Sequence, residues 1–333
     1  MSANEPRLPV TVLTGFLGSG KTTLLRALLQ HPGMGDTAVV VNELGEVGLD
    51  HVLVREVTDE VVLLASGCVC CSVRDDLAAT LEDLHAKRAA GVIPPFSRVV
   101  VETTGLADPA PIVQTLIGSR TLVERFSLAG LTATVDCKLG ARELDEHAEA
   151  VKQAALADCL VLTKSDLAAP EDIEALRARI ARLNAEARIV ESAPATFPAP
   201  DVLFEKRGRR PFSERQHGLP PRFLQGPHDS RIGSFVVRID APVDWAPFSE
   251  WLELLLAARG ESILRLKGLV NVAGRSRPVV LQCVQHMAYP PGELDDWPDA
   301  DRATRLTFIT RDFTRAAAVN SLREIFGESV QVS

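Results

Sequence analysis

The stretch that decides the fold of this chain is GFLGSGKT, from Gly15 to Thr22, which overlaps the end of the apolar run PVTVLTG that begins at Pro9. It matches the pattern G-x-x-x-x-G-K-[ST] in full, and the helical pattern TLLRALLQ follows at once. In such a strand, loop and helix, the glycines let backbone N–H groups wrap phosphates, and the helix N-terminus adds its positive dipole. Lys21 reaches the terminal phosphates and Thr22 ligates Mg²⁺. The sequence therefore predicts a nucleoside triphosphate site, with an empty glycine-rich turn as the alternative.

Seven short, near-continuous apolar runs alternate with helical patterns between Leu8 and about Val190. The runs begin at Pro9, Thr37, Val61, Ser97, Leu128, Asp158 and Ala187. Strands buried on both faces have this pattern, and the helices between them supply the crossovers of a parallel sheet. The pattern predicts an α/β domain over residues 1–192, with a mostly parallel sheet.

The composition changes between residues 193 and 230, where Pro, Arg and Gly dominate and a linker is expected. Its basic run at 206–210 is interpreted as a solvated segment, with docking to an acidic client as the alternative. In residues 231–333 a strand, an amphipathic helix, three strand-like runs and a final helix follow in that order. This order predicts a smaller α+β domain with an antiparallel sheet.

The overall composition is that of an ordinary folded protein. Of the 333 residues, 46% are apolar and 24% are charged, which excludes a disordered, collagen-like or coiled-coil chain. The formal net charge of -8 opposes binding to nucleic acid and to anionic membranes. The N-terminal residues MSANEPRLPV lack the basic and apolar segments of a signal peptide. We therefore expect a cytoplasmic protein with reduced cysteines, whose partners include neither nucleic acid nor a membrane.

The identity of the base is indicated by TKSD, from Thr163 to Asp166, which ends the apolar run that begins at Asp158. Open α/β sheets bind ligands at this carboxyl edge. The carboxylate of Asp166 can accept hydrogen bonds from N1–H and the exocyclic amine of guanine, whereas adenine has no proton on N1. The motif therefore favours GTP over ATP; an Asp that caps a helix is the alternative.

A third segment, ETTGLADP, follows another buried run and begins at Glu102. Glu102 can hold Mg²⁺ through water or orient the attacking water, and the backbone N–H of Gly105 can contact a γ-phosphate. Asp108, followed by Pro109, is equally typical of a helix N-cap. We predict that Lys21, Glu102 and Gly105 carry the reaction.

Three of the six cysteines gather in GCVCC, at Cys68, Cys70 and Cys71. The capping-box pattern Ser72-Val-Arg-Asp75 follows, which predicts that the thiols lie at a helix N-terminus, where the dipole favours thiolate. Thiolates bind Zn²⁺ most often, and Co²⁺ accepts a similar ligand set. Because neighbouring residues of an extended chain face opposite sides, all three converge only if the chain turns there, so two or three can ligate.

The segment VVVNELGEVGLDH offers Glu43, Glu46 and His51 as a fourth metal ligand, and we prefer Glu43. A structural zinc and buried apolar cysteines are the alternatives to a cargo site. The other three cysteines stand alone on apolar runs, which predicts core packing for Cys137, Cys159 and Cys283.

Together and in this order, the motifs resemble the CobW-type metallochaperone GTPases, relatives of the UreG and HypB nickel-insertion GTPases. The segments that carry the resemblance are GFLGSGKTT from Gly15, VNELGEVGLD from Val41, GCVCC from Gly67, ETTGLADP from Glu102 and TKSD from Thr163. LRLKGLVNVAG from Leu264 and RLTFITRD from Arg305 extend it through the second domain, so it covers nearly the whole chain.

The resemblance implies a set of site residues. The GTP-binding set is Gly15, Gly18, Ser19, Gly20, Lys21, Thr22, Thr23, Thr163, Lys164 and Asp166, with Mg²⁺ on Thr22 and the cargo metal on the Cys-x-Cys-Cys run. Thr163 replaces the Asn of many other GTPases, a variation that the family accepts. Several members carry a His-rich tract, but here His217, His228 and His286 are scattered. Of these, His286 is the candidate for a role, since members have a similar segment there.

The function that the resemblance implies is that of a GTP-dependent metallochaperone. Hydrolysis would change the loops Asn42–Asp50 and Gly105–Pro109, so that Zn²⁺ or Co²⁺ passes to a client metalloenzyme or a cobalamin-pathway protein. A P-loop small-molecule kinase is one rival, which leaves TKSD unexplained; a zinc-stabilised binding module without catalysis is another. Because the Asn42 loop and the cysteines should emerge at one sheet edge, we predict that GTP tightens metal binding through Glu43.

Overall fold

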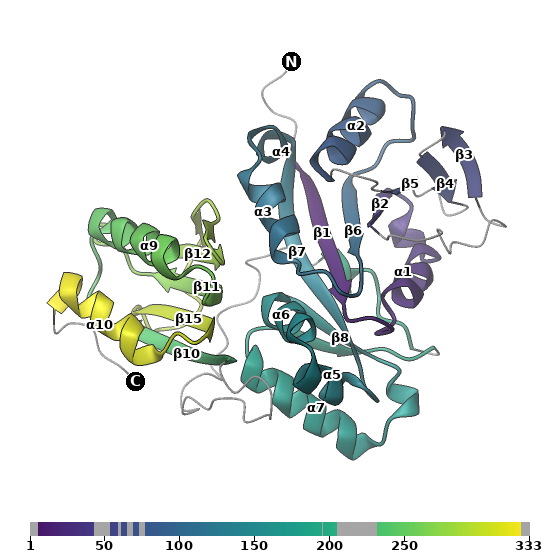
Figure 1. Cartoon of the computed structure of the whole chain (residues 1–333). Coiled ribbons are helices and arrows are strands. Elements are labelled where there is room, and N and C mark those ends of the chain that lie inside the picture. The colour runs from purple at the N-terminus through teal and green to yellow at the C-terminus, as the bar shows by residue number, and fades with distance from the viewer. Residues whose placement is uncertain are drawn as a thin grey trace. The chain divides into compact units, whose positions relative to one another are not determined.

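A computed structural model describes residues 6–42, 54–58, 61–64, 69–72, 77–194, 196–204 and 232–327 of the chain. Contacts divide the chain into two compact units. The first holds Met1–Arg177 with Ala187–Arg207, and the second holds Ala178–Glu186 with Gly208–Ser333. Each unit is built around a sheet of its own (Figure 1).

The first unit contains a mostly parallel sheet, as the apolar runs predict. Its strands are β1 (Leu8–Gly15), β2 (Thr37–Asn42), β3 (Val54–Thr58), β4 (Val61–Leu64), β5 (Val69–Ser72), β6 (Arg98–Thr103), β7 (Phe126–Asp136), β8 (Cys159–Thr163) and β9 (Arg188–Glu191). They lie in the order β3-β4-β5-β2-β6-β1-β7-β8-β9. All neighbours from β5 to β9 pair in parallel, whereas β3 and β4 are antiparallel additions at one edge.

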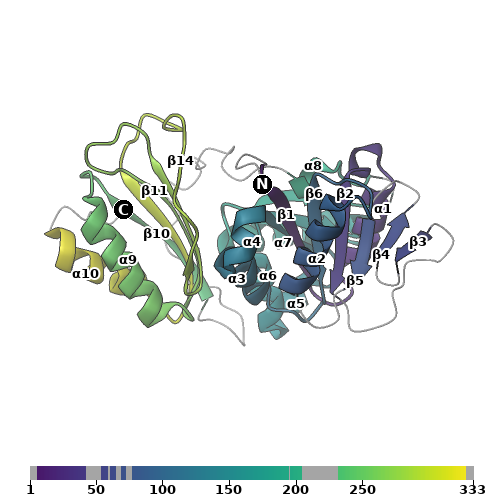
Figure 2. The same cartoon turned by 90° about the horizontal axis from the view of Figure 1, so that it is seen from above.

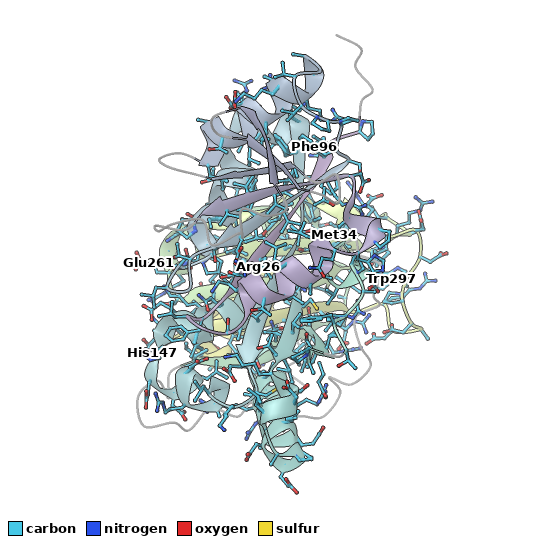
Figure 3. All side chains as sticks on the ribbon, turned by 90° about the vertical axis from the view of Figure 1, so that its right-hand side faces the viewer. Arg26, Met34, Phe96, His147, Glu261 and Trp297 are labelled. Atoms are coloured by element: carbon cyan, nitrogen blue, oxygen red, sulfur yellow. The ribbon has the colours of Figure 1, made fainter. Side chains whose placement is uncertain are left out.

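Helices cover both faces of this sheet (Figure 2). They are α1 (Lys21–Leu29), α2 (Leu77–Ala89), α3 (Ala110–Gly118), α4 (Arg120–Arg125), α5 (Gly140–Glu146), α6 (Ala148–Leu156), α7 (Pro170–Leu183) and α8 (Asp201–Phe204), with 3-10 turns at Pro32–Met34 and Ser165–Leu167. On one face, leucines of α1 pack with Met34 and with strand residues such as Val39 and Val161 in one apolar cluster. Met34 is labelled near α1 in Figure 3. This packing fixes the start of α1, and with it the glycine-rich loop.

The beginning of the predicted linker belongs to the first unit. Val202 belongs to α8, a helix that contacts β1 and β7 of the sheet. Its apolar side chain therefore joins the apolar cluster beneath α1. The rest of the predicted linker, from residue 205 to 230, lies outside the described residues. The domain boundaries at 192 and 230 stay predictions.

The second unit is an α+β domain with an antiparallel sheet, again as predicted. Its strands are β10 (Ile232–Ile239), β11 (Ile263–Val270), β12 (Val279–Val284), β13 (Met287–Ala288), β14 (Gly292–Glu293) and β15 (Thr304–Arg311). They lie in the order β10-β15-β11-β12-β13, and β14 pairs with β12. Two helices, α9 (Trp245–Arg259) and α10 (Arg315–Phe326), lie on one face of this sheet (Figures 1 and 2). Phe248, Trp251 and Phe308 are among the residues of the core between them.

Among the described residues, the helices are all too short or too polar to span a lipid bilayer.

Candidate functional site

The GFLGSGKT segment forms the loop between β1 and α1. Three of its glycines have positive φ angles, 143° at Gly15, 75° at Gly18 and 90° at Gly20, and residues with a side chain rarely adopt such angles. At Gly15 a Cβ atom would lie 2.1 Å from Oγ1 of Thr134 in β7. The loop therefore needs glycine both for its conformation and for its close approach to the sheet. The loop leads into the N-terminus of α1, and the backbone N–H groups at a helix N-terminus favour the binding of anions.

The side chain of Lys21 turns back over this loop. It is only 5% exposed, and Nζ donates hydrogen bonds to the carbonyl oxygens of Gly15 and Phe16 at 3.0 and 3.3 Å. The ammonium is thus held against the loop by the Gly15 and Phe16 carbonyls. A phosphate oxygen is a stronger acceptor than these neutral carbonyls, so the group can exchange partners when a triphosphate binds.

Thr22 and Glu102 meet where α1 begins and β6 ends. Oγ1 of Thr22 donates to Oε1 of Glu102 at 2.8 Å, and Glu102 is 1% exposed. Because β6 pairs with both β1 and β2, Glu102 lies at the centre of the sheet edge. A hydroxyl and a carboxylate are the hard oxygen donors that Mg²⁺ prefers, so this pair fits a Mg²⁺ ion bound with a triphosphate. Thr23, the next residue, is exposed.

Gly105 packs directly against the phosphate-binding loop. A Cβ atom at this position would lie 2.6 Å from Cα and 2.8 Å from the backbone N of Leu17. The turn continues with a hydrogen bond from the Ala107 N–H to the Thr104 carbonyl at 3.2 Å. The structure therefore brings Gly105 to the loop, as its predicted contact with a γ-phosphate requires.

Asp108 has the structural role that the sequence left open. Its Oδ1 accepts from the Ala110 N–H at 3.0 Å at the start of α3. Its Oδ2 accepts from Nζ of Lys152 at 2.7 Å. Pro109 stands at the N-cap position, one residue later than predicted, but the Asp108 carboxylate still bonds the first N–H of the helix. The ion pair adds a contact that no local pattern indicated.

The TKSD segment is bonded to the phosphate-binding loop. Oγ1 of Thr163 donates to the Ser19 carbonyl at 2.6 Å, and Nζ of Lys164 donates to the Gly18 carbonyl at 2.8 Å. A hydroxyl thus replaces the amide of the usual Asn in this contact. Asp166 lies exposed in the turn Ser165–Leu167.

Asp136 is a residue of this edge that the sequence analysis missed. It ends β7, is 1% exposed, and accepts from Nζ of Lys164 at 2.7 Å. Oδ1 of Asp136 accepts from the backbone N–H of Lys138 at 2.7 Å. The signal was available, because the run LAGLTATVD places an acid at the carboxyl end of a buried strand, as in the motifs at Glu102 and Asp166.

A small cavity beneath the loop is lined by Phe16, Glu143 and Gln153, among others. Burial raises the pKa of the Glu143 carboxyl above its usual range, and the negative charge of Asp136 raises it further. The Phe16 ring stacks on His147, with 4.4 Å between ring centroids; His147 is labelled in Figure 3.

The cysteine segment differs from its predicted conformation. Cys70 and Cys71 lie inside β5 instead of at a helix N-terminus, and Ser72 is the last residue of that strand. β5 pairs with β2 on one side and β4 on the other, so sheet pairing on both sides outweighs the local capping pattern. Cys68 and the three candidates for the fourth ligand, Glu43, Glu46 and His51, lie outside the described residues.

The remaining three cysteines are buried, and His286 contacts the end of a helix. Cys137, Cys159 and Cys283 are buried, as predicted. Burial raises the pKa of the Cys137 thiol to about 11 and that of Cys283 to about 12, so both are neutral at pH 7. Nδ1 of His286 lies 2.9 Å from the Leu256 carbonyl in the last turn of α9. Among the described residues, no three His, Cys, Asp or Glu side chains are placed to hold a metal ion.

Two protein-family models match the chain. The model described as CobW/HypB/UreG, nucleotide-binding domain, matches residues 9–191. The chain belongs to the CobW family. A second model, the cobalamin synthesis protein cobW C-terminal domain, matches residues 232–326. As a member of this family, the chain is a GTPase, which agrees with the loop and TKSD geometry.

Relatives of known name cover nearly the whole chain. It is 35% identical over 303 residues to the zinc chaperone YjiA of Escherichia coli, an alignment that spans 91% of this chain and 93% of the relative. It is 30% identical over 354 residues to the zinc chaperone CobW of Pseudomonas aeruginosa, spanning 95% and 91%. The crystal structure of Zn(II)-bound YjiA GTPase from E. coli superposes with a TM-score of 0.78 and 32% identity, covering 96% of this chain and 99% of that one. A triple mutant of that protein, with one glutamate and two cysteines changed to alanine, is also described as Zn(II)-bound.

Proposed function

We propose that this CobW-family GTPase is a metallochaperone that binds Zn²⁺ as cargo and couples GTP hydrolysis to its delivery to a client metalloenzyme. The observation that carries the proposal is the position of β2. It pairs with the cysteine-bearing strand β5 on one side and with β6, which carries Glu102, on the other. Two relatives named as zinc chaperones support Zn²⁺ over Co²⁺.

The strand register aligns the end of β5 with Glu102 of β6, which supports the proposal. Val40 of β2 is the partner of Cys71 on one side and of Val101 on the other, and Val41 is the partner of Ser72 and Glu102. Because β2 lies between β5 and β6, two strand spacings of about 4.8 Å separate Ser72 from Glu102 by about 10 Å. A metal held near the end of β5 would thus be a near neighbour of the Thr22–Glu102 pair.

The nucleotide half of the proposal assigns a role to each contact. Backbone N–H groups from Gly15 to Gly20 and the Lys21 ammonium bind the phosphates of GTP, and the carboxylate of Asp166 accepts from guanine. Thr22 and Glu102 hold Mg²⁺, which when bound neutralises phosphate charge. Gly105 donates its N–H toward the γ-phosphate and so senses hydrolysis.

The metal half assigns the cargo site to Cys68, Cys70 and Cys71, with Glu43 as the fourth ligand. Glu43 directly follows Asn42, the last residue of β2. Since β2 and β5 are parallel neighbours, the chain leaves β2 at the edge where β5 ends. Thiolates with one carboxylate suit Zn²⁺. GTP that orders the loop after Asn42 would complete the ligand set, and loss of the γ-phosphate would release Glu43.

The experiment that tests this coupling is a competition titration of Zn²⁺ with a chromophoric chelator. Zn²⁺ should bind about 5- to 150-fold more tightly with a non-hydrolysable GTP analogue than with GDP. Glu43→Ala and Cys70→Ala should remove this difference. Zinc content alone is a weaker readout, because the alanine triple mutant of the relative is Zn(II)-bound. Equal affinities in the two nucleotide states of the unmutated protein would rule out nucleotide-gated release.

Two controls address the rival functions. Release of one phosphate per GTP without a phosphorylated product excludes a small-molecule kinase. Removal of the metal by a chelator should leave the far-UV circular dichroism nearly unchanged, whereas loss of the fold on chelation would indicate a structural zinc.

A further inference from the structure

We infer that Lys152 and Gln153 of α6 are positioning residues for GTP hydrolysis, because together they hold the Gly105–Asp108 segment against the phosphate-binding loop. The inference rests on the proposed role of Gly105. It concerns two residues that lie outside every motif of the sequence. They belong to α6, which begins at Ala148, 38 residues after the start of α3 at Ala110.

Gln153 makes a two-pronged contact with the segment. Its Nε2 donates to the Gly105 carbonyl at 3.2 Å and to the Ala107 carbonyl at 3.0 Å. Gln153 is 1% exposed, so water does not compete for these bonds. Two carbonyl acceptors also fix which end of the amide faces the segment.

The oxygen end of the Gln153 amide has no hydrogen-bond partner in the part of the chain that the structure describes. Among the described residues, no donor lies within reach of Oε1 of Gln153. Burial of a polar atom without a partner costs stability, and an apolar side chain at this position would avoid that cost. The polar contacts that the structure gives Gln153 all go to the Gly105–Ala107 turn, which is the feature that its amide serves.

Lys152 holds the other end of the same segment. Its Nζ donates to Oδ2 of Asp108 at 2.7 Å, with side chains 24% and 27% exposed. Oδ1 of Asp108 accepts a hydrogen bond from the N–H of Ala110, the first residue of α3. Adjacent residues of one helix therefore bond three of the four residues from Gly105 to Asp108.

The segment has little freedom on its opposite side. Gly105 lies so close to Leu17 that a Cβ would come within 2.6 Å of its Cα. The N–H of Gly105 is thus placed by α6 from one side and by the phosphate-binding loop from the other. A small displacement of this N–H would weaken its contact with a γ-phosphate, while the residues that bind GDP would keep their places.

The test uses the full-length protein and separates turnover from nucleotide binding. Gln153→Glu has the same shape but directs a carboxylate at two carbonyls, so we expect kcat to fall about tenfold to a hundredfold. The Kd of a fluorescent GDP analogue should stay within about twofold, because Gly105 has no role in GDP binding. A folded Gln153→Glu protein with an unchanged kcat would overturn the inference, as would parallel losses of kcat and GDP affinity.

A charge exchange provides a second, independent readout. Lys152→Asp and Asp108→Lys should each lower kcat. The double variant should restore it in part, because the ion pair reforms in reverse while the bond from the Ala110 N–H to Asp108 stays lost. Failure of the double variant to recover any of the lost kcat would overturn the inference. This readout does not depend on Gln153→Glu, so it still tests the inference if that variant does not fold. Lys87→Ala is the matched control, since Lys87 pairs with Asp83 at 2.7 Å and its side chain is also 24% exposed; its kcat should be that of the unmutated protein.

Lys21→Ala separates this inference from the proposed function. If turnover survives in Lys21→Ala, the loop is not the active site and the proposal fails. If turnover is lost there but is normal in Gln153→Glu, only the role of Gln153 fails.

Discussion

The two sheets bury polar side chains in different ways. In the first unit, Lys21, Glu102 and Thr163 come from different elements and bond to the phosphate-binding loop or to a neighbour beside it. In the second unit, Arg305 pairs with Asp299 at 2.6 Å, and Arg238 forms an ion pair with Asp301.

The difference lies in what the polar groups are bonded to. At the carboxyl edge of the parallel sheet, Lys21 and Lys164 both bond to neutral backbone carbonyls, which a phosphate can replace, although Lys164 also pairs with Asp136. In the second unit, the guanidinium groups of Arg305 and Arg238 bond to aspartate carboxylates, so these charges neutralise each other. The comparison therefore assigns ligand binding to the first edge and stability to the second network, and the following variants test that division in order of their expected effect on GTP turnover.

The largest effect is expected from Lys21→Ala. Removal of the ammonium should lower kcat for GTP by about 10²- to 10³-fold, because solvent does not replace a positioned charge beside the triphosphate. Turnover is measured by phosphate release under saturating GTP. The melting temperature should change little, since the hydrogen bonds of the ammonium to the Gly15 and Phe16 carbonyls are local contacts within the loop. A rate near that of the unmutated protein would reject this loop as the reaction site.

Asp166→Asn should have the next largest effect. It replaces a carboxylate that accepts two guanine donors with an amide that offers one acceptor and one mismatched donor. We expect GTP affinity to fall about 10- to 100-fold, measured by isothermal titration. Asp172→Asn, an exposed acid in the first turn of α7, is the control. Tighter binding of ATP than of GTP by the unmutated protein would contradict the assignment.

Much of this edge could be predicted from the sequence because it is encoded locally. The seven apolar runs predicted every strand of this sheet except β3 and β5, and GFLGSGKT and TKSD predicted the loop and its neighbour. Asp108 shows the limit: its cap is local, but its pair with Lys152 spans 44 residues. Gln153 escaped prediction for the same reason, since its partners are 46 and 48 residues away and carbonyls have no sequence signature.

The cysteine segment shows a different kind of failure. Ser72 and Asp75 have the spacing of a capping box, which indicated a helix at the cysteines. The strand VREVT of β3 carries no continuous apolar run, so the antiparallel edge that extends the sheet was not expected. Pairing of β5 with both β2 and β4 is a tertiary contact, and such contacts override local propensity.

Arg305→Met tests the second unit and should leave turnover within about twofold. The pair that it breaks is largely buried, with side chains 8% and 15% exposed. We expect the free energy of unfolding of this unit to fall by about 3–5 kcal/mol, because Asp299 is left without its partner. Urea denaturation measures the loss. Arg275→Met, which breaks an exposed pair with Glu293, should cost about 0.5 kcal/mol or less. Equal losses in the two variants would contradict the structural role of the buried network.

The smallest effect concerns Glu143, a buried acid that lines the small cavity beneath the loop. Burial raises the pKa of its carboxyl above 4.5, and Asp136 adds to the rise. The folded state therefore binds this proton more tightly than the unfolded state, so the contribution of Glu143 to stability is greatest below about pH 4.5 and falls as the pH rises through the raised pKa. Glu143→Gln removes the titration. The variant should be more stable than the unmutated protein at about pH 7 and should lose that advantage at about pH 4. Urea denaturation at both pH values measures the difference, with Glu146→Gln, an exposed acid of the same helix, as the control. A stability difference that is the same at both pH values would show that its surroundings do not destabilise the Glu143 carboxylate. The region near the loop would then tolerate a buried charge as well as the Arg305–Asp299 network of the second unit does.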